Sequence, residues 1–115
     1  MSLIEKPWGS EYLIEANEKY VLKKLFMKAG HRCSLQYHEY KHETIYVISG
    51  VLVIKHGISL DTISTKTYNT GCTISIKPGE IHRMEALEDS VYLEASTPEL
   101  DDVIRLQDDY IRSNL

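Results

Sequence analysis

The stretch GHRCSLQYHEYKHETIYVISG, residues 30–50, contains the pattern that decides the fold. Gln36 and His38 are two residues apart, so on a β-strand both side chains point to the same face. After a short turn, Glu43 shares a face with Ile45, which places a carboxylate in line with residues suited to a core. Burying an ionisable group on an apolar face is costly unless a partner neutralises it, and a metal ion is one such partner. The stretch therefore predicts two strands that carry a polar site.

The β pattern extends outward from this stretch, from about Glu11 to Ser96. Short runs of strand-forming residues are separated by glycine-containing turns such as Ser49-Gly50 and Pro78-Gly79. The expected strands are Lys19–Lys28, Arg32–His38, Glu43–Ser49, Val51–Lys55, Leu60–Thr67, Thr73–Ile76, His82–Ala86 and Ser90–Ala95. Many short strands at this spacing predict an all-β antiparallel sandwich or barrel. The tail, Glu99 to Asn114, is expected to be irregular or to form a helical turn or two.

Length and composition restrict the class of protein. A chain of 115 residues predicts one domain, residues 1–115, with its core at about 11–96. Its composition, 43% hydrophobic and 26% charged residues, is ordinary for a globular protein. The formal charge of −4 disfavours a nucleic-acid surface, and no apolar run is long enough to suggest a membrane span. The N-terminus lacks a signal-peptide pattern, so we expect a cytoplasmic protein in which Cys33 and Cys72 are reduced thiols.

A fourth candidate ligand lies far along the chain. His82 follows the Pro78-Gly79 turn and shares a face with Met84. Together, Gln36, His38, Glu43 and His82 offer two imidazoles, one carboxylate and one amide oxygen, a set that suits a divalent transition metal and leaves a position open. The alternative is that both histidines are satisfied core or surface residues and that Glu43 is solvated.

The motifs around these residues resemble those of a known superfamily. Gly30, Gln36-Tyr37-His38, Glu43 and Gly50 resemble the first cupin motif, and Gly71 with Pro78-Gly79-Glu80-Ile81-His82 resembles the second. Gln36 stands where many cupins have a histidine, and this version resembles the metal site of mannose-6-phosphate isomerases. The stretches Lys6-Pro7-Trp8-Gly9, Ser34–His38, Ile81–Glu85 and Asp102–Tyr110 resemble the cupin domain of the bifunctional isomerase/guanylyltransferase enzymes, so the likeness extends from about Glu5 to Arg112.

The resemblance implies a single-domain cupin, a small antiparallel jelly-roll barrel with one divalent metal held by Gln36, His38, Glu43 and His82. Zinc is the first expectation, with manganese, iron or nickel as alternatives. The chain departs from the family at Glu39-Tyr40-Lys41-His42, where histidines and an arginine are usual, and at Tyr110-Ile111-Arg112, where Tyr-Gly-Arg is usual. The first departure lies at the expected mouth of the pocket and therefore affects which substrate fits.

The implied activity is metal-dependent aldose–ketose isomerisation of a sugar phosphate or nucleotide-linked sugar. The main alternative is a non-catalytic cupin module that binds metal and sugar for a partner enzyme. Metal-dependent dioxygenase chemistry is a third reading, disfavoured because Gln36 replaces an imidazole. No nucleic acid or membrane partner is expected.

An isomerase acting on a phosphate ester needs cationic side chains. The candidates are Arg105 as a catalytic residue, and Lys23, Lys24 and Arg83 as substrate-binding residues. Because Lys23 and Lys24 are adjacent on a strand, whichever face points inward carries one lysine with it.

Other residues are given plainer roles. His31 is expected to be solvated, and His56, beside Gly57, is expected to sit in a loop and to take no part in the site. His42 points to the face opposite Glu43 and is a reserve ligand. Cys33 alternates away from the proposed ligands, and the burial of Glu94 is left open.

Apolar residues occur on both faces of several strands, for example Leu35 and Tyr37 opposite Gln36 and His38. One face fills the barrel and the other needs cover, so we expect a homodimer.

Overall fold

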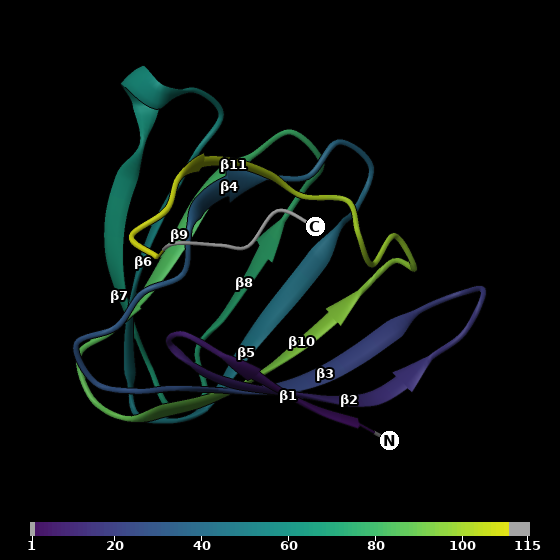
Figure 1. Cartoon of the computed structure of the whole chain (residues 1–115). Coiled ribbons are helices and arrows are strands. Elements are labelled where there is room, and N and C mark those ends of the chain that lie inside the picture. The colour runs from purple at the N-terminus through teal and green to yellow at the C-terminus, as the bar shows by residue number, and fades with distance from the viewer. Residues whose placement is uncertain (1, 111–115) are drawn as a thin grey trace.

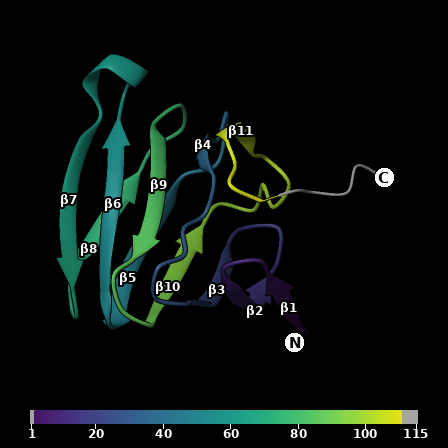
Figure 2. The same cartoon turned by 60° about the vertical axis from the view of Figure 1, so that its left-hand side comes forward.

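The computed structural model describes residues 2–110, which form two antiparallel sheets that face each other (Figures 1 and 2). The elements are β1 (Ser2–Lys6), β2 (Gly9–Ala16), β3 (Val21–Met27), β4 (Leu35–Tyr37), β5 (Glu43–Ser49), β6 (Val51–Gly57), the 3-10 turn η1 (Leu60–Thr62), β7 (Ser64–Asn69), β8 (Thr73–Ile76), β9 (Ile81–Ala86), β10 (Ser90–Ser96) and β11 (Ile104–Gln107). One sheet has the order β1-β2-β3-β10-β5-β8 and the other β11-β4-β9-β6-β7. The predicted all-β sandwich is confirmed. In residues 2–110, no helix is long and apolar enough to cross a membrane.

The core lies between the sheets and is built by alternating side chains. On β5, Ile45 and Val47 are buried, while Tyr46 and Ile48 point outward and are exposed. The buried cluster contains Trp8, Leu25, Met27, Cys33, Ile45, Val47, Leu52, Ile54, Ile76, Met84, Ala86 and Tyr92. Residues from both sheets contribute, as expected when two half-apolar sheets cover each other.

The β5–β6 hairpin depends on Gly50. Its φ of +90° lies in the region that favours glycine, and a Cβ there would stand 2.3 Å from Ser90 Oγ. Ser90 Oγ is held at this position because it accepts a hydrogen bond from Val51 N at 3.1 Å, so a larger residue at position 50 would collide with it. The turn that the sequence predicts at Ser49-Gly50 is therefore present.

Two predicted elements are wrong. The expected strand Leu60–Thr67 is divided, because the Ser59 and Thr62 hydroxyls bond each other at 2.9 Å and close the turn η1 before β7 starts at Ser64. Within the tail Glu99–Asn114, residues 104–107 form strand β11 instead of a helical turn, since they pair with β4. Residues 111–114 lie outside the described residues.

Strand pairing extends beyond the region where the β pattern is strongest. β1 pairs with β2 from Ser2↔Leu13 to Lys6↔Gly9, so the sheet begins nine residues before Glu11. β1 is mostly exposed and lies at the edge of its sheet, which explains why its sequence lacks a buried face.

Candidate metal centre

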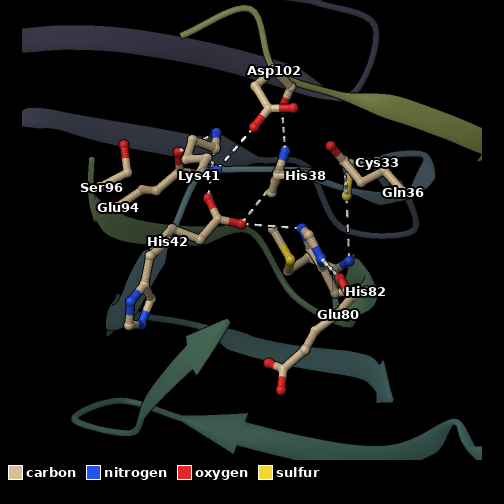
Figure 3. Close-up of polar contacts among 12 residues, drawn as sticks. Cys33, Gln36, His38, Lys41, His42, Glu80, His82, Glu94, Ser96 and Asp102 are labelled. Atoms are coloured by element: carbon tan, nitrogen blue, oxygen red, sulfur yellow. Dashed lines mark hydrogen bonds and ion pairs between the residues drawn. The ribbon is translucent and has the colours of Figure 1, made fainter. Parts of the chain in front are cut away.

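Three buried side chains from both sheets converge between the layers (Figure 3). His38 follows β4, Glu43 opens β5, and His82 lies near the start of β9. Glu43 Oε1 is 3.2 Å from His38 Nε2 and 3.1 Å from His82 Nε2. All the candidate ligand atoms lie within 4.8 Å of one another, which is a spacing that one metal ion can bridge.

The opposite nitrogen of each imidazole is fixed by a backbone carbonyl. His38 Nδ1 donates to the Asp102 carbonyl, and His82 Nδ1 donates to the Glu80 carbonyl at 3.1 Å. A carbonyl only accepts, so Nδ1 carries the proton and the neutral imidazole has its lone pair at Nε2. Two lone pairs and a carboxylate oxygen then face one another, an arrangement that a proton or a metal ion can bridge. The donor set fits a divalent metal, and the carbonyls supply the outer contacts usual for histidine ligands.

Asp102 holds the loop that carries His38. Its carboxylate accepts the backbone N–H groups of Glu39, Tyr40 and Lys41 at 3.0, 2.7 and 2.9 Å. Burial disfavours the charged form, but these three hydrogen bonds outweigh it and lower the pKa of Asp102. The same residue therefore fixes the turn with its side chain and the His38 ring with its carbonyl.

Lys41 is a site residue that the sequence prediction missed. It is buried, and its Nζ lies 3.6 Å from both Glu43 Oε2 and Glu94 Oε2. Burial would lower the pKa of Lys41, but the charges of Glu94 and Glu43 outweigh this and raise it. Lys41 precedes β5, so strand alternation does not give its position; the loop that Asp102 holds through Lys41 N directs this side chain inward.

The two carboxylates beside Lys41 differ strongly in charge state. Burial disfavours ionised Glu43, but its contacts with His38 and His82, which are hydrogen bonds when Nε2 carries a proton, prevail and hold the pKa of Glu43 well below the usual range. Burial, followed by the negative charge of Glu43, raises the pKa of Glu94 to about 8. Of the two carboxylates, Glu43 at the centre of the donor set therefore carries the negative charge more readily.

The triad lines a cavity of about 520 Å³ between the sheets. Its volume is within the range of small-molecule sites, and its wall contains both apolar and charged side chains. Of the residues that the sequence predicted, Gln36, Lys23 and Arg105 also line it. Gln36 Nε2 contacts Cys33 Sγ at 3.8 Å and Ser34 O at 3.4 Å, and its role as a fourth ligand stays a prediction. Arg105 is exposed, and within residues 2–110 it forms no ion pair.

The other two predicted substrate residues do not reach the cavity. Lys24 is exposed on the outer face of the six-stranded sheet, because β3 turns Lys23 inward. Arg83 is buried, and its Nε donates to Cys33 O at 2.8 Å while Nη2 donates to Asp109 Oδ1 at 3.1 Å. These two contacts link Arg83 on β9 to the segment before β4 and to the segment after β11.

The remaining histidines lie outside the triad. His42 is exposed and points away from His38 and His82 (Figure 3), and His56 pairs with Glu80 at 2.8 Å. His31 Nδ1 bonds the Tyr110 hydroxyl at 2.8 Å, so its expected solvation is corrected to a half-buried contact with the tail.

The prediction that Cys33 points away from the ligands is wrong. The chain before Leu35 is irregular, so strand alternation does not extend back to Cys33, whose side chain lines the cavity. Burial raises the pKa of the Cys33 thiol to about 11, and its Sγ accepts a hydrogen bond from Met84 N at 3.3 Å. The thiol is therefore protonated at neutral pH, and Cys33 is not among the three converging donors.

Comparisons with solved structures define the class of fold. KdgF from Halomonas sp. superposes with a TM-score of 0.77 at 16% identity, over 88% of this chain and 89% of KdgF. Oxalate decarboxylase from Bacillus subtilis gives a TM-score of 0.80 at 21% identity, over 92% of this chain and 30% of that one. The fold is that of the cupins.

Sequence comparison then gives the family. The profile of the family "Mannose-6-phosphate isomerase C-terminal" matches residues 2–108, and the chain belongs to this family. The xanthan biosynthesis protein XanB of Xanthomonas campestris pv. campestris is 29% identical over 96% of this chain. The chain spans 24% of the length of that relative.

We expect His38→Ala and His82→Ala to abolish metal binding, because each removes one of three converging donors. Divalent zinc or manganese at one hundred times its Kd should stabilise the parent by about 2.7 kcal/mol, and neither variant should respond. Elemental mass spectrometry and thermal unfolding with and without metal measure this. His42→Ala is the matched control, because its exposed ring should not affect metal content; equal loss in His42→Ala would contradict the assigned triad.

We expect Asp102→Ala to weaken both the fold and the metal site. It leaves three backbone N–H groups without their acceptor, which should lower the free energy of unfolding by roughly 1–3 kcal/mol. The loosened loop should also reduce metal affinity about 10- to 100-fold, as loss of outer contacts to ligands does elsewhere. Chemical denaturation and metal titration test these effects. Asp61→Ala, which removes an exposed carboxylate in η1 outside the cavity lining, is the control. Parental metal affinity in Asp102→Ala would show that the carboxylate does not position the site.

Proposed function

We propose that this domain is a metal-dependent isomerase that interconverts the aldose and ketose forms of a sugar phosphate. The observation that carries the proposal is the His38–Glu43–His82 triad, which opens onto a cavity that also contains a buried lysine. Membership of the mannose-6-phosphate isomerase C-terminal family supports the same chemistry.

The triad and Gln36 would hold the metal. When bound, a divalent ion would polarise the oxygens of the sugar. Zinc remains the first expectation, and manganese is a real alternative because the oxalate decarboxylase of Bacillus subtilis has Mn(II) centres.

Lys41 and Glu94 are the groups beside the triad that are free to act on a sugar. Both line the cavity, and Lys41 Nζ lies between the two carboxylates at 3.6 Å from each. We assign to Lys41 the stabilisation of negative charge on the sugar oxygen, and to Glu94 the movement of a proton between adjacent carbons. Isomerisation needs both functions, and the pair supplies a donor and an acceptor in one contact.

Arg105 is suited to the phosphate. It belongs to the cavity lining, is exposed, and has no acidic partner within residues 2–110. A guanidinium that no carboxylate neutralises can bind a phosphate through two hydrogen bonds.

We expect the metal-loaded domain to isomerise a hexose 6-phosphate and Arg105→Ala to lose most of this activity. Loss of a charge-assisted contact should lower kcat/KM about 10- to 100-fold with metal content unchanged. Product formation from a panel of sugar phosphates, followed by NMR, measures it. Lys66→Ala, which removes an exposed cation on β7 away from the cavity, should keep parental activity. Binding without turnover across the panel would reject the isomerase and favour a sugar-binding module.

We also propose that the domain forms a homodimer through the outer face of the six-stranded sheet. Leu3, Tyr12, Ile14, Phe26 and Val91 surround a mostly apolar hollow of about 320 Å³ on this face. Lys24 is the one charged residue in that lining.

The size of this outer face suits a second copy. Tyr46 and Ile48 continue it across β5 and are 43% and 37% exposed. Six strands about 4.8 Å apart and roughly seven residues long cover on the order of 500–600 Å² in projection, close to the ~800 Å² of accessible surface that a standard interface buries per partner.

We expect the parent to be dimeric by light scattering and Ile48→Glu to be monomeric, because a buried unpaired carboxylate opposes association. Ile58→Glu is the control. Ile58 is 77% exposed but lies beyond β6, away from the outer face, so this variant should stay dimeric. A monomeric parent at micromolar concentration would overturn the proposed dimer.

A further inference from the structure

One wall of the cavity carries a row of alternating acidic and basic side chains that extends beyond the metal centre. Glu11 on β2, Lys23 on β3 and Glu94 on β10 all line the cavity, followed by Lys41 and Glu43 at the start of β5. These strands are hydrogen-bonded in the order β2-β3-β10-β5, and Lys23 stands directly opposite Glu94 in the β3–β10 register. The row therefore extends continuously from the triad across the six-stranded sheet.

The far end of this row is a single buried ion pair. Lys23 Nζ lies 3.1 Å from Glu11 Oε2, and the two side chains are only 11% and 12% exposed. Because neighbouring strands are about 4.8 Å apart, β3 and β2 lie roughly 10 and 14 Å from β5. The Glu11–Lys23 pair is thus separate from the metal donors but belongs to the same cavity.

Stability alone does not explain this pair. An ion pair withdrawn from water loses much of its hydration, and apolar residues of similar size often stabilise a fold as well or better. Within residues 2–110, Glu11 forms the only ion pair of Lys23, so an ammonium with three N–H donors keeps donor capacity beside the cavity. Lys23 is therefore held in position by Glu11 and still has N–H groups that can donate to a ligand in the cavity.

The chemistry of the pair selects hydroxyl groups over phosphate. Glu11 neutralises Lys23, so the pair offers a fixed donor and a fixed acceptor but little net charge for an anion. Each sugar hydroxyl both donates and accepts, and neighbouring hydroxyls can use Lys23 and Glu11 together. The same cavity wall includes Trp8 and Leu13, which can cover the C–H groups of a sugar.

We propose that Glu11 and Lys23 form a hydroxyl-binding subsite that recognises the end of a polyhydroxylated ligand remote from the metal donors. The subsite rests on the proposed function for the identity of the ligand, a sugar phosphate, but it does not require turnover. Lys23, expected from the sequence to bind phosphate, is thereby assigned to hydroxyl recognition, and the phosphate is left to Arg105.

Binding to the metal-loaded chain tests the subsite. Mannose 6-phosphate and the shorter glyceraldehyde 3-phosphate are compared by calorimetry, because a three-carbon chain cannot extend from the triad to the pair. We expect the parent to prefer the hexose phosphate at least tenfold. Lys23→Gln and the double variant Glu11→Gln/Lys23→Gln should reduce this preference to about twofold or less, by losing one or two hydrogen bonds to the ligand.

The double variant controls for misfolding, since it keeps a neutral hydrogen-bonding pair and strands no buried charge. Lys24→Gln is the matched control, because it removes the adjacent lysine on the outward face. Metal content and thermal unfolding should match the parent in all variants used.

The possible outcomes distinguish a failure of the proposed subsite from a failure of the proposed isomerase activity. A parent without hexose preference, or a preference that survives in the double variant, overturns the subsite even if isomerisation is observed. A preference that depends on Lys23 but not on Lys24, without turnover, supports the subsite and rejects the isomerase. If neither sugar phosphate binds, both proposals fail.

Discussion

Two imidazoles that aim their Nε2 atoms at one carboxylate oxygen are the constraint around which this domain is organised. The carbonyls of Asp102 and Glu80 fix the opposite nitrogens, so neither ring can turn to relieve the crowding of acceptors. Such an arrangement is costly in a buried site without a cation. At the junction of β4, β5 and β9 the two sheets therefore meet at a group of donors that could hold a metal ion, which favours a binding centre over a purely structural core.

The C-terminal segment completes the centre from the edge of the five-stranded sheet. Asp102 caps the loop after His38, and β11 then pairs with β4, which sets Arg105 opposite Gln36 in the register. Farther along, Asp109 accepts hydrogen bonds from Arg32 and Arg83. Because these contacts hold the segment at both ends, the position of Arg105 at the cavity is determined by groups that are not themselves in the cavity. This explains why Arg83, a candidate from sequence, has a structural role instead.

How much could be predicted from sequence depended on whether the deciding contact was local. Strand alternation correctly placed His38, Glu43 and His82 toward one interior, since the period of two is a property of the backbone itself. It could not choose between Lys23 and Lys24, because β3 is apolar on both faces and only the opposing sheet shows which face is inside. It was wrong for Cys33, where the strand has not yet begun, and for the tail, whose strand exists only through pairing with distant β4. Lys41 was missed for the same reason, because it precedes β5 and its inward position depends on the loop held by Asp102.

Charge and apolarity are separated along each strand that crosses the interior. On β5 the inward side chains pass from Glu43 to Ile45, and on β9 from His82 to Met84. On β10, which runs antiparallel to β5, the order is reversed and Tyr92 precedes Glu94. The same end of three neighbouring or facing strands is therefore polar, and the other end supplies the packed core. Since the apolar end can stabilise the barrel, the polar end can carry buried charges, and in the function proposed here their cost would be recovered on binding a cation and a polyhydroxylated ligand.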